Sequence, residues 1–505
     1  MHSLGVLERI SIVPDANVPD TNEIPLVPTR LLIGSEWCEA ASGKRFATLN
    51  PATEQVLAEI AEAGAPEVDA AVAAARAALR RGPWPMMTGA ERGRVLRRLA
   101  DLMRERSEEL VLLESLDAGK PMAATRRMDL PAAIDCLEYY AGWADKISGE
   151  VVPTRRDALT YIHRVPVGVV AAIVPWNFPL MNAVWKIAPA LACGCTVVLK
   201  PAELTPLSAL WLGQAALEAG LPPGVLNVIP GFGAVAGSAL VSHRGIDKIA
   251  FTGSPQTGRS IMRAAADNIT RIGLELGGKS PSIVFADADL DTAIRQTASG
   301  AFFNAGQVCS AATRVIVADE VHDAFVEGLA KRANSLRLGN PLDTATTMGP
   351  VISQRQMERV LGYVAAGRED GAETVCGGGR AGNAGYFVEP TVFAGVRADM
   401  RIAQEEIFGP VVAVQRFAKE EEAIDLANGT DYSLAAAVWT NDINRGHRMS
   451  QQLDAGTVWI NTYGPTDARL PWGGMGGQSG IGRDLGRTAI ENYTEQKVVW
   501  LQTRA

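Results

Sequence analysis

The feature that most constrains this 505-residue chain is an alternation of short apolar runs and helical segments between residues 168 and 274. The apolar runs are rich in valine, isoleucine and leucine and are too short for helices, so they predict buried strands at 168–174, 196–199, 225–229, 247–251 and 271–274. The segments between them predict helices at 180–191, 206–219, 234–241 and 257–266. Such alternation forms right-handed βαβ crossovers, so we expect a parallel sheet with helices on both faces.

A second alternating set follows. It predicts a strand at 282–285, a helix at 290–302, a strand at 314–318 and a helix at 321–335, after which the pattern continues less regularly to Gly480. The fold class is therefore α/β, with two parallel-sheet units.

The two ends of the chain do not show this regular alternation of strands and helices. Short strands are expected near 32–34 and 43–46, and helices at 66–80, 90–113 and 130–147. Residues 156–165 and 496–501 favour strands, the first in a protruding hairpin. Residues 1–28 contain four prolines and little periodicity, which is typical of a surface extension.

Composition excludes several classes of protein. The net charge of −8 gives no electrostatic footprint for nucleic acid or an anionic membrane, and no apolar run is long enough to span a bilayer. The N-terminus lacks a signal peptide, and six scattered cysteines suggest free thiols in a reducing compartment, so a cytoplasmic protein is expected. No Cys/His pair has zinc-finger spacing, so no metal site is expected.

Polar or small residues follow several predicted strands, where a parallel sheet binds ligands. Asn177, between two prolines, could donate to an oxyanion or merely cap a helix. Glu203, close to Lys200, could bind a ribose and repel a 2′-phosphate, or form a solvated charge pair. Gly253 and Ser254 would let a pyrophosphate approach backbone amides, although the usual G-x-G-x-x-G is absent and 231–233 contains only its first part.

Three further stretches contain candidate catalytic groups. Glu275 precedes Gly277 and Gly278, which allow close approach, and is a candidate base. Cys309 lies in a loop between a predicted helix and strand, and is either a nucleophile or a small core residue. Glu406 and Phe408 supply a carboxylate and a ring that could grip a second ribose and a flat heterocycle, or form a turn with core side chains.

Taken in order, these six stretches resemble the non-acylating NAD(P)-dependent aldehyde dehydrogenases from about Leu32 to Leu501, and residues 139–146 (YYAGWADK) are also similar to that family. The resemblance implies the family fold and NAD-dependent oxidation of a small-molecule aldehyde to the acid. The reaction would pass through a Cys309 thiohemiacetal and thioester, with hydride transfer to NAD and Glu275-assisted hydrolysis. Glu203 favours NAD, and use of NADP stays open.

The resemblance also implies roles for individual residues. Cys309 would be the nucleophile and Glu275 the base, Asn177 would form an oxyanion hole with the Cys309 amide, and Lys186 and Asp484 would pass protons to solvent. The cofactor would contact Trp176, Lys200, Glu203, Gly233, Gly253, Ser254, Gly277, Glu406 and Phe408. The aldehyde would contact Phe178, Asn182, Trp185, Thr466 and Trp472.

Some positions depart from the family pattern. Residues 471–480 are one residue longer than usual and lack its lysine, and Asp484 replaces a glutamate. Thr466 and Asn182 stand where many relatives have an aromatic and an apolar residue, which implies a more polar or roomier tunnel. Aromatic, terpenoid, amino and betaine aldehydes all remain open as substrates.

We predict an NAD-binding domain (29–147 and 167–277), a catalytic domain (278–484) and an oligomerisation extension (148–166 and 485–505). In the family this extension adds strands to a neighbouring subunit, so a homodimer or homotetramer is expected. Two alternatives stay open: a CoA-acylating or thioester hydrolase enzyme on the same scaffold, and a non-catalytic NAD-binding protein.

Overall fold

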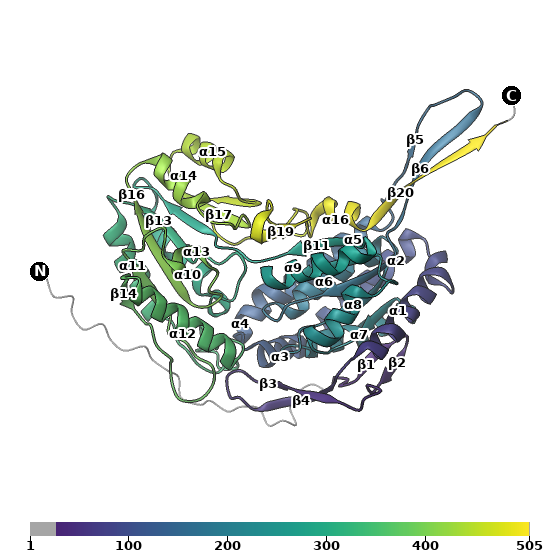
Figure 1. The fold of residues 1–505 in the computed structure, drawn as a ribbon, viewed down its shortest axis with the longest axis horizontal. Coiled ribbons are helices and arrows are strands. Elements are labelled where there is room, and N and C mark those ends of the chain that lie inside the picture. The colour runs from purple at the N-terminus through teal and green to yellow at the C-terminus, as the bar shows by residue number, and fades with distance from the viewer. Residues whose placement is uncertain (1–26, 504–505) are drawn as a thin grey trace, which may run out of the picture.

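A computed structural model describes residues 27–503. It has two lobes, each built around a large sheet, and an arm that projects from one of them (Figure 1). Nearly all of the predicted N-terminal extension, residues 1–28, lies outside the described residues.

The first lobe contains an eight-stranded sheet in the order β19-β11-β10-β7-β8-β9-β1-β2. Its five central strands are parallel and match the five predicted apolar runs. They are β7 (Val169–Ile173), β8 (Thr196–Lys200), β9 (Leu226–Val228), β10 (Lys248–Thr252) and β11 (Arg271–Glu275). The strands added at the two edges of this parallel sheet pair antiparallel with their neighbours and were not part of the predicted set of five. They are β1 (Leu31–Ile33), β2 (Glu36–Cys38) and β19 (Gly480–Ile481).

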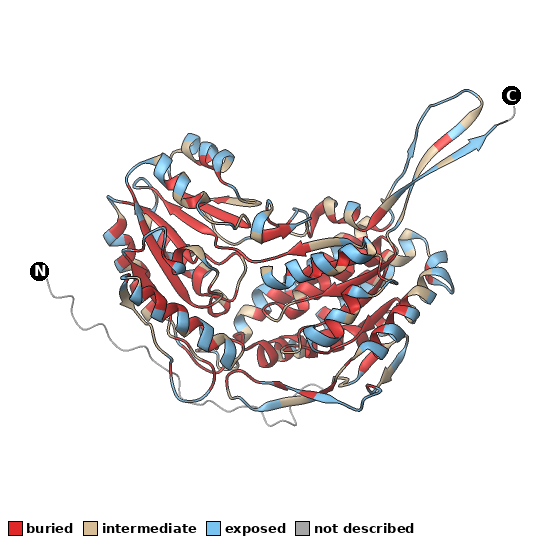
Figure 2. Ribbon diagram, in the orientation of Figure 1, coloured by how far each residue is buried: buried red, intermediate tan, exposed pale blue. Residues whose placement is uncertain are grey.

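Helices cover both faces of this sheet. Alternate residues of a strand point to opposite sides, and every residue of β7 is buried, so each face presents apolar side chains for helices to cover. Val170 and Ala172 of β7 pack in one core with six helices, whereas Val169, Ala171 and Ile173 pack in another with three. The six are α2 (Gly89–Glu105), α3 (Ser107–Ala118), α5 (Leu130–Trp143), α6 (Pro179–Ala192), α7 (Leu207–Glu218) and α16 (Gly486–Asn492). The three are α1 (Ala65–Arg80), α8 (Ser238–Ser242) and α9 (Pro255–Asn268). Figure 2 shows the buried strands between these exposed helix faces.

Some expected helix boundaries were wrong. The helix predicted at 90–113 is two helices, α2 and α3, because Arg106 between them leaves helical dihedral angles (φ −113°, ψ 33°). The helix predicted at 130–147 ends at Trp143, and the one predicted at 234–241 begins as a π-helical turn, Gly233–Gly237, before α8. A short helix, α4 (Met122–Ala124), and a second π-helical turn, Thr125–Asp129, precede α5.

The second lobe has a seven-stranded sheet in the order β14-β15-β16-β13-β12-β17-β18, in which only β14 is antiparallel to its neighbour. The strands are β12 (Pro281–Val284), β13 (Arg314–Ala318), β14 (Glu373–Cys376), β15 (Thr391–Ala394), β16 (Val411–Phe417), β17 (Ala435–Trp439) and β18 (Thr457–Ile460). Helices of one face are α10 (Leu290–Phe302), α11 (His322–Asn334), α12 (Gln354–Glu369) and α13 (Arg401–Gln404). Those of the other are α14 (Glu420–Asn428) and α15 (Ile443–Gln452).

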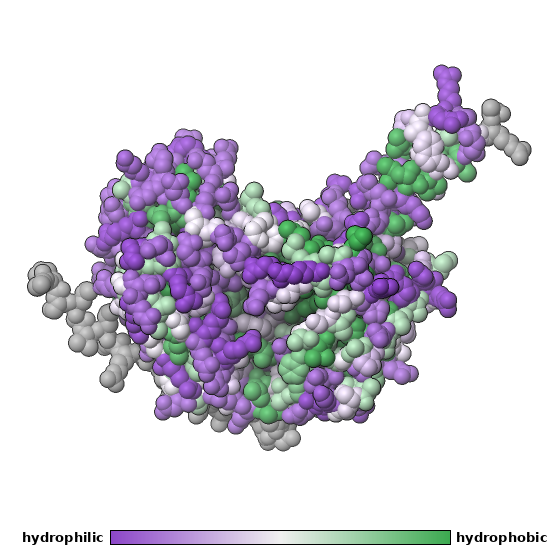
Figure 3. All heavy atoms as spheres, viewed as in Figure 1, coloured by the Kyte–Doolittle hydropathy of each residue, from purple (hydrophilic) through white to green (hydrophobic). Residues whose placement is uncertain are grey.

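The arm is a three-stranded antiparallel sheet formed from distant parts of the chain. Its strands are β5 (Glu150–Val151), β6 (Ala158–Pro166) and β20 (Thr494–Gln502), the last reached through α16 (Gly486–Asn492). β6 and β20 pair along their whole lengths, which confirms the strands predicted at 156–165 and 496–501. Figure 3 shows hydrophobic residues on the surface of the arm. The exposed large apolar side chains of its three strands are those of Val151, Leu159, Val498, Trp500 and Leu501.

The remaining sheet is a β-ribbon of β3 (Arg45–Leu49) and β4 (Val56–Ala61). The α/β fold class is thus confirmed, while the predicted domain boundaries stay a prediction. Within residues 27–503, no helix is both long enough and apolar enough to cross a bilayer.

Candidate active site

A cavity of about 1650 Å³ lies between the two large sheets. The carboxyl ends of β7, β8, β10 and β11 open into it, as expected for a sheet with parallel central strands. Small-molecule sites usually measure about 300–1,000 Å³, so this cavity has room for two ligands. Every residue predicted for the site lines it except Lys186.

The loop that carries Cys309 is sharply reversed. After α10 ends at Phe302, the backbone of Asn304, Ala305 and Gly306 is left-handed, with φ of 50°, 51° and 71°. Left-handed geometry costs roughly 1–2 kcal/mol for an ordinary residue. At Gly306, any side chain would also collide with the Gly409 carbonyl. The strained turn therefore depends on its surroundings, and it brings Cys309 to the cavity wall.

Side-chain amides hold this turn. Asn177, which follows β7, donates from Nδ2 to the Gln307 carbonyl at 2.9 Å, and Asn304 Nδ2 donates to the Asn177 carbonyl at 3.0 Å. Gln307 is fully buried, and its side-chain oxygen accepts from the Ile352 amide at 2.8 Å. A primary amide has two N–H groups. One of those of Asn177 therefore fixes the loop that carries Cys309, and the other remains available to a ligand.

The Cys309 thiol does not ionise easily in this setting. Burial, reinforced by the nearby Glu406 and Glu275 carboxylates, raises its pKa to about 12. A thiol is a weak nucleophile until it loses its proton, so Cys309 could act as a nucleophile only if a nearby base accepted that proton.

Glu275, the last residue of β11, is a buried carboxylate with that capacity. Its Oε2 is fully enclosed and has no hydrogen-bond partner among the described residues. Burial and the charge of Asp484 raise its pKa well above the ordinary range, and the cation of Lys186 opposes this effect. The carboxylate packs against Gly473, where a side chain would collide with it.

Lys186 and Asp484 form an ion pair behind this glutamate. Lys186 Nζ lies 2.9 Å from Asp484 Oδ2, and the lysine side chain is only 1% exposed. Asp484 is fixed by two backbone hydrogen bonds with Trp472, of 2.7 and 2.8 Å. The pair therefore connects the inner wall of the cavity with the protein interior behind it.

Lys200 and Glu203 lie at the carboxyl end of β8. Lys200 Nζ donates to the carbonyls of Pro201 (2.8 Å) and Gly231 (2.7 Å), and lies 3.8 Å from Glu203 Oε2. Burial lowers the pKa of Lys200 to about 8. An ammonium has three donors, so one remains for Glu203 or for a ligand beside it.

Glu406 and two glycines form a second polar corner. The Gly278 amide donates to Glu406 Oε1 at 3.0 Å, and a Cβ at Gly277 would overlap the Glu406 carboxylate. Burial raises the pKa of Glu406 to about 7. Phe408, in a left-handed conformation (φ 61°), packs edge-on against Trp176 with ring centroids 5.2 Å apart.

Two aromatic walls flank the rest of the cavity. Phe178 stacks on Phe303 with centroids 6.2 Å apart, and Trp185 meets Trp472 edge-on at 6.3 Å. Asn182 is buried, whereas Thr466 is exposed at the rim of the cavity. Lys120, paired with Asp129 within the protein, lies 3.8 Å from the Phe178 ring centroid.

Several residues at the site were not predicted. Asn304 and Gln307 lie in the stretch around Cys309, but their roles depend on a backbone turn that their residue types do not reveal. Tyr463 donates from its hydroxyl to the Ser310 carbonyl, and Ser479 Oγ donates to the Gly277 carbonyl at 2.8 Å. These contacts join segments more than 150 residues apart, and no local pattern signals them.

The residue set fits a dinucleotide. The cavity offers a helix N-terminus at Ser254 and the carboxylates of Glu203 and Glu406. It also has glycines where the backbone must approach a ligand, namely Gly233, Gly253 and Gly277. A Cβ at Gly233 would meet no atom within 4 Å, so this edge of the cavity is open.

Comparison with known proteins gives a consistent result. The model of the aldehyde dehydrogenase family matches residues 37–499. An aldehyde dehydrogenase of Emericella nidulans is 50% identical over 484 residues, which cover 95% of this chain and 97% of the relative. Aldehyde dehydrogenase 1A1 of Mesocricetus auratus is 48% identical, covering 96% and 97%. The structure of an aldehyde dehydrogenase from Bacillus cereus as an NAD+ complex is 49% identical, covering 98% of this chain and 100% of that chain, with a TM-score of 0.94.

Proposed function

This chain belongs to the aldehyde dehydrogenase family of oxidoreductases, and we propose that it oxidises an aldehyde to the carboxylic acid with NAD and water, using Cys309 as nucleophile. The observation that carries the proposal is the convergence of Cys309, Asn177 and Glu275 on one buried cavity. The net reaction converts aldehyde, NAD+ and water into acid, NADH and a proton.

The first step is attack by the Cys309 sulfur on the aldehyde carbon. Because the thiol has a pKa of about 12, its proton must pass to a base, and Glu275 is the carboxylate whose raised pKa suits it to accept one. Because the proton moves to Glu275 and not to solvent, the two groups keep a single negative charge between them, and no repulsion between a thiolate and a carboxylate arises.

The attack converts the carbonyl oxygen into an oxyanion. The second N–H of Asn177 and the Cys309 amide would hold it, and the hydrogen bond from Asn177 to Gln307 fixes the amide in place beforehand. Loss of one such donor typically lowers the rate by about 100- to 1,000-fold. Collapse of the oxyanion removes the hydride from the carbon and leaves a thioester on Cys309.

Hydrolysis of that thioester requires an activated water. Glu275, deprotonated again, would take a proton from water as the water oxygen attacks the thioester carbonyl, and cleavage of the C–S bond would release the acid and the Cys309 thiolate. The Lys186–Asp484 pair would then pass the proton from Glu275 to solvent, which restores Glu275 for the next turnover.

NAD, when bound, supplies the acceptor for the hydride that the substrate carbon loses. Lys200 and Glu203 would hold its adenosine ribose, Ser254 its pyrophosphate, and Glu406 its nicotinamide ribose, with Trp176 and Phe408 beside the ring. Gly233, Gly253 and Gly277 would allow the backbone to approach it. Glu203 would disfavour the 2′-phosphate of NADP by charge repulsion.

Association into a homodimer or homotetramer is part of the proposal. The arm exposes the apolar residues named above and an unpaired strand edge, both of which favour pairing with another subunit. Light scattering that finds only monomer at micromolar concentration would contradict it.

The test is NADH formation by the purified protein with NAD and a panel of aldehydes, without CoA. Cys309→Ala should abolish turnover, whereas Cys376→Ala, on β14 away from the cavity, should retain it. Activity that depends on CoA, or that survives Cys309→Ala, would refute the proposed reaction.

A further inference from the structure

One residue on the substrate wall has a hydrogen-bonding group that the fold does not use. Asn182 is 6% exposed and lines the cavity. Its Nδ2 donates to the Phe178 carbonyl at 3.1 Å. A carbonyl only accepts, so this bond fixes the amide orientation and directs Oδ1 the other way. Among residues 27–503, no group donates to Asn182 Oδ1.

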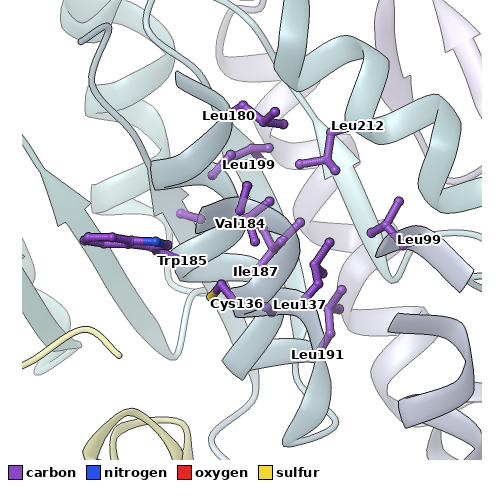
Figure 4. Packing of buried hydrophobic residues seen from close by; sticks show 14 of the residues in the cluster. Leu99, Cys136, Leu137, Leu180, Val184, Trp185, Ile187, Leu191, Leu199 and Leu212 are labelled. Atoms are coloured by element: carbon purple, nitrogen blue, oxygen red, sulfur yellow. The ribbon is translucent and has the colours of Figure 1, made fainter. Parts of the chain in front are cut away.

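The position of Asn182 on its helix explains what this oxygen faces. Phe178, Asn182 and Trp185 are spaced i, i+4 and i+7 at the start of α6, so they lie on one stripe. The opposite stripe, with Leu180, Val184, Ile187 and Leu191, fills the core. Figure 4 shows the Trp185 indole directed away from these aliphatic side chains. Asn182 therefore lies between one residue of each aromatic wall.

Two carboxylates of this part of the cavity are paired with lysines within the protein. Asp129 pairs with Lys120, and Asp484, which is hydrogen-bonded to the Trp472 backbone, pairs with Lys186. The cavity residues around Asn182 are otherwise aromatic or apolar, namely Phe178, Met181, Trp185, Phe303 and Trp472. A ligand that covers the Asn182 oxygen without supplying a donor leaves this acceptor unsatisfied, so a ligand with a donor at that point gains affinity. Aromatic rings also favour stacked or edge-to-face partners.

From these contacts we infer that the enzyme selects an uncharged aromatic aldehyde whose ring carries an O–H or N–H donor, and that Asn182 Oδ1 accepts this hydrogen bond. The inference rests on the proposed function, since it places the aldehyde end of the substrate at Cys309. The ring lies between the Phe178/Phe303 and Trp185/Trp472 walls, with its donor toward α6.

The test compares two substrates of nearly equal size, 4-hydroxyphenylacetaldehyde and 4-methylphenylacetaldehyde, by kcat/KM. Wild-type enzyme should prefer the hydroxyl compound by about tenfold, the equivalent of one hydrogen bond to a buried acceptor. Asn182→Leu, which keeps the number and branching of the side-chain heavy atoms and removes the acceptor, should bring the ratio close to one. Met181→Leu, a change in a neighbouring cavity residue without hydrogen-bonding groups, should keep the wild-type ratio.

The outcomes separate this inference from the proposed function. NAD-dependent oxidation of both compounds with no preference, or a preference that Asn182→Leu leaves intact, overturns the inference and leaves the reaction standing. A higher kcat/KM for hexanal or for an anionic semialdehyde than for either aromatic compound also overturns it. Absence of turnover with every aldehyde, despite NAD binding, contradicts the proposed function itself.

Discussion

The ion pair behind Glu275 allows a prediction in which two variants act in opposite directions. Asp484 raises the pKa of Glu275 and Lys186 lowers it. Glu275 must be deprotonated to act as a base, so activity falls as the pH drops through its raised pKa. Asp484→Asn should therefore move this acidic limb to lower pH, and Lys186→Gln should move it to higher pH.

The size of the shift follows from Coulomb's law. Two unit charges roughly 8 Å apart, at an effective dielectric constant of about 20, interact by about 2 kcal/mol. One pH unit corresponds to about 1.4 kcal/mol, so each variant should move the limb by about 1.5 pH units. Replacing either Lys186 or Asp484 leaves the other without its ion-pair partner, and breaking a buried pair costs about 3–5 kcal/mol of stability. Activity should therefore be measured well below each variant's melting temperature.

The assay is the pH dependence of kcat with saturating NAD and aldehyde. Asp484→Glu keeps the charge and should leave the limb near its wild-type position, and the double variant Lys186→Gln/Asp484→Asn should return toward it. Glu275→Gln should remove the limb. A shift of both single variants in the same direction, or no measurable shift in either, would refute the reasoning.

Three further results are expected. Gly277→Ala should weaken NAD binding at least tenfold, because the new Cβ displaces the Glu406 carboxylate; tryptophan fluorescence titration measures this, and an unchanged Kd would contradict it. Lys200 has a pKa of about 8, so its positive charge is present below that pH and lost above it. The Kd for NAD, measured by calorimetry, should therefore rise as the pH passes about 8, and a Kd that does not change with pH would count against binding of NAD by Lys200. Glu203→Gln should raise kcat/KM with NADP relative to NAD by roughly tenfold or more, since a repulsive charge is removed, and an unchanged ratio would show that Glu203 does not select the cofactor.

Much of the first lobe could be predicted because its strands are short, apolar and separated by helices. β7 to β11 all lie within a residue or two of the expected runs. The break at Arg106 could not be predicted, because α2 and α3 are both good helix-forming sequences and only their packing decides where the chain bends. The antiparallel edge strand β19 was also missed, since two residues carry no periodicity and Gly480 pairs with Glu275 from about 200 positions away.

The residues of the candidate site were likewise only partly predictable from the sequence. Residues that directly follow strands, such as Asn177, Lys200 and Glu275, could be placed near one another, because parallel strands end at one edge of a sheet. The partners that hold them could not. The left-handed turn at Asn304 and the hydroxyl of Tyr463 on the Ser310 carbonyl depend on tertiary contacts. The unpaired oxygen of Asn182 likewise becomes apparent only once its amide is seen bonded to Phe178.

The central claim, a covalent thioester on Cys309 hydrolysed with the help of Glu275, can be tested by mass spectrometry of the Glu275→Gln variant at a pH high enough for hydroxide to take the thiol proton in place of Glu275. After incubation with NAD and an aldehyde and an acid quench, we expect an acyl group on the peptide that contains Cys309, absent when NAD is omitted or when Cys309 is replaced by alanine. No adduct despite NADH formation, or an adduct on one of the other five cysteines, would contradict it.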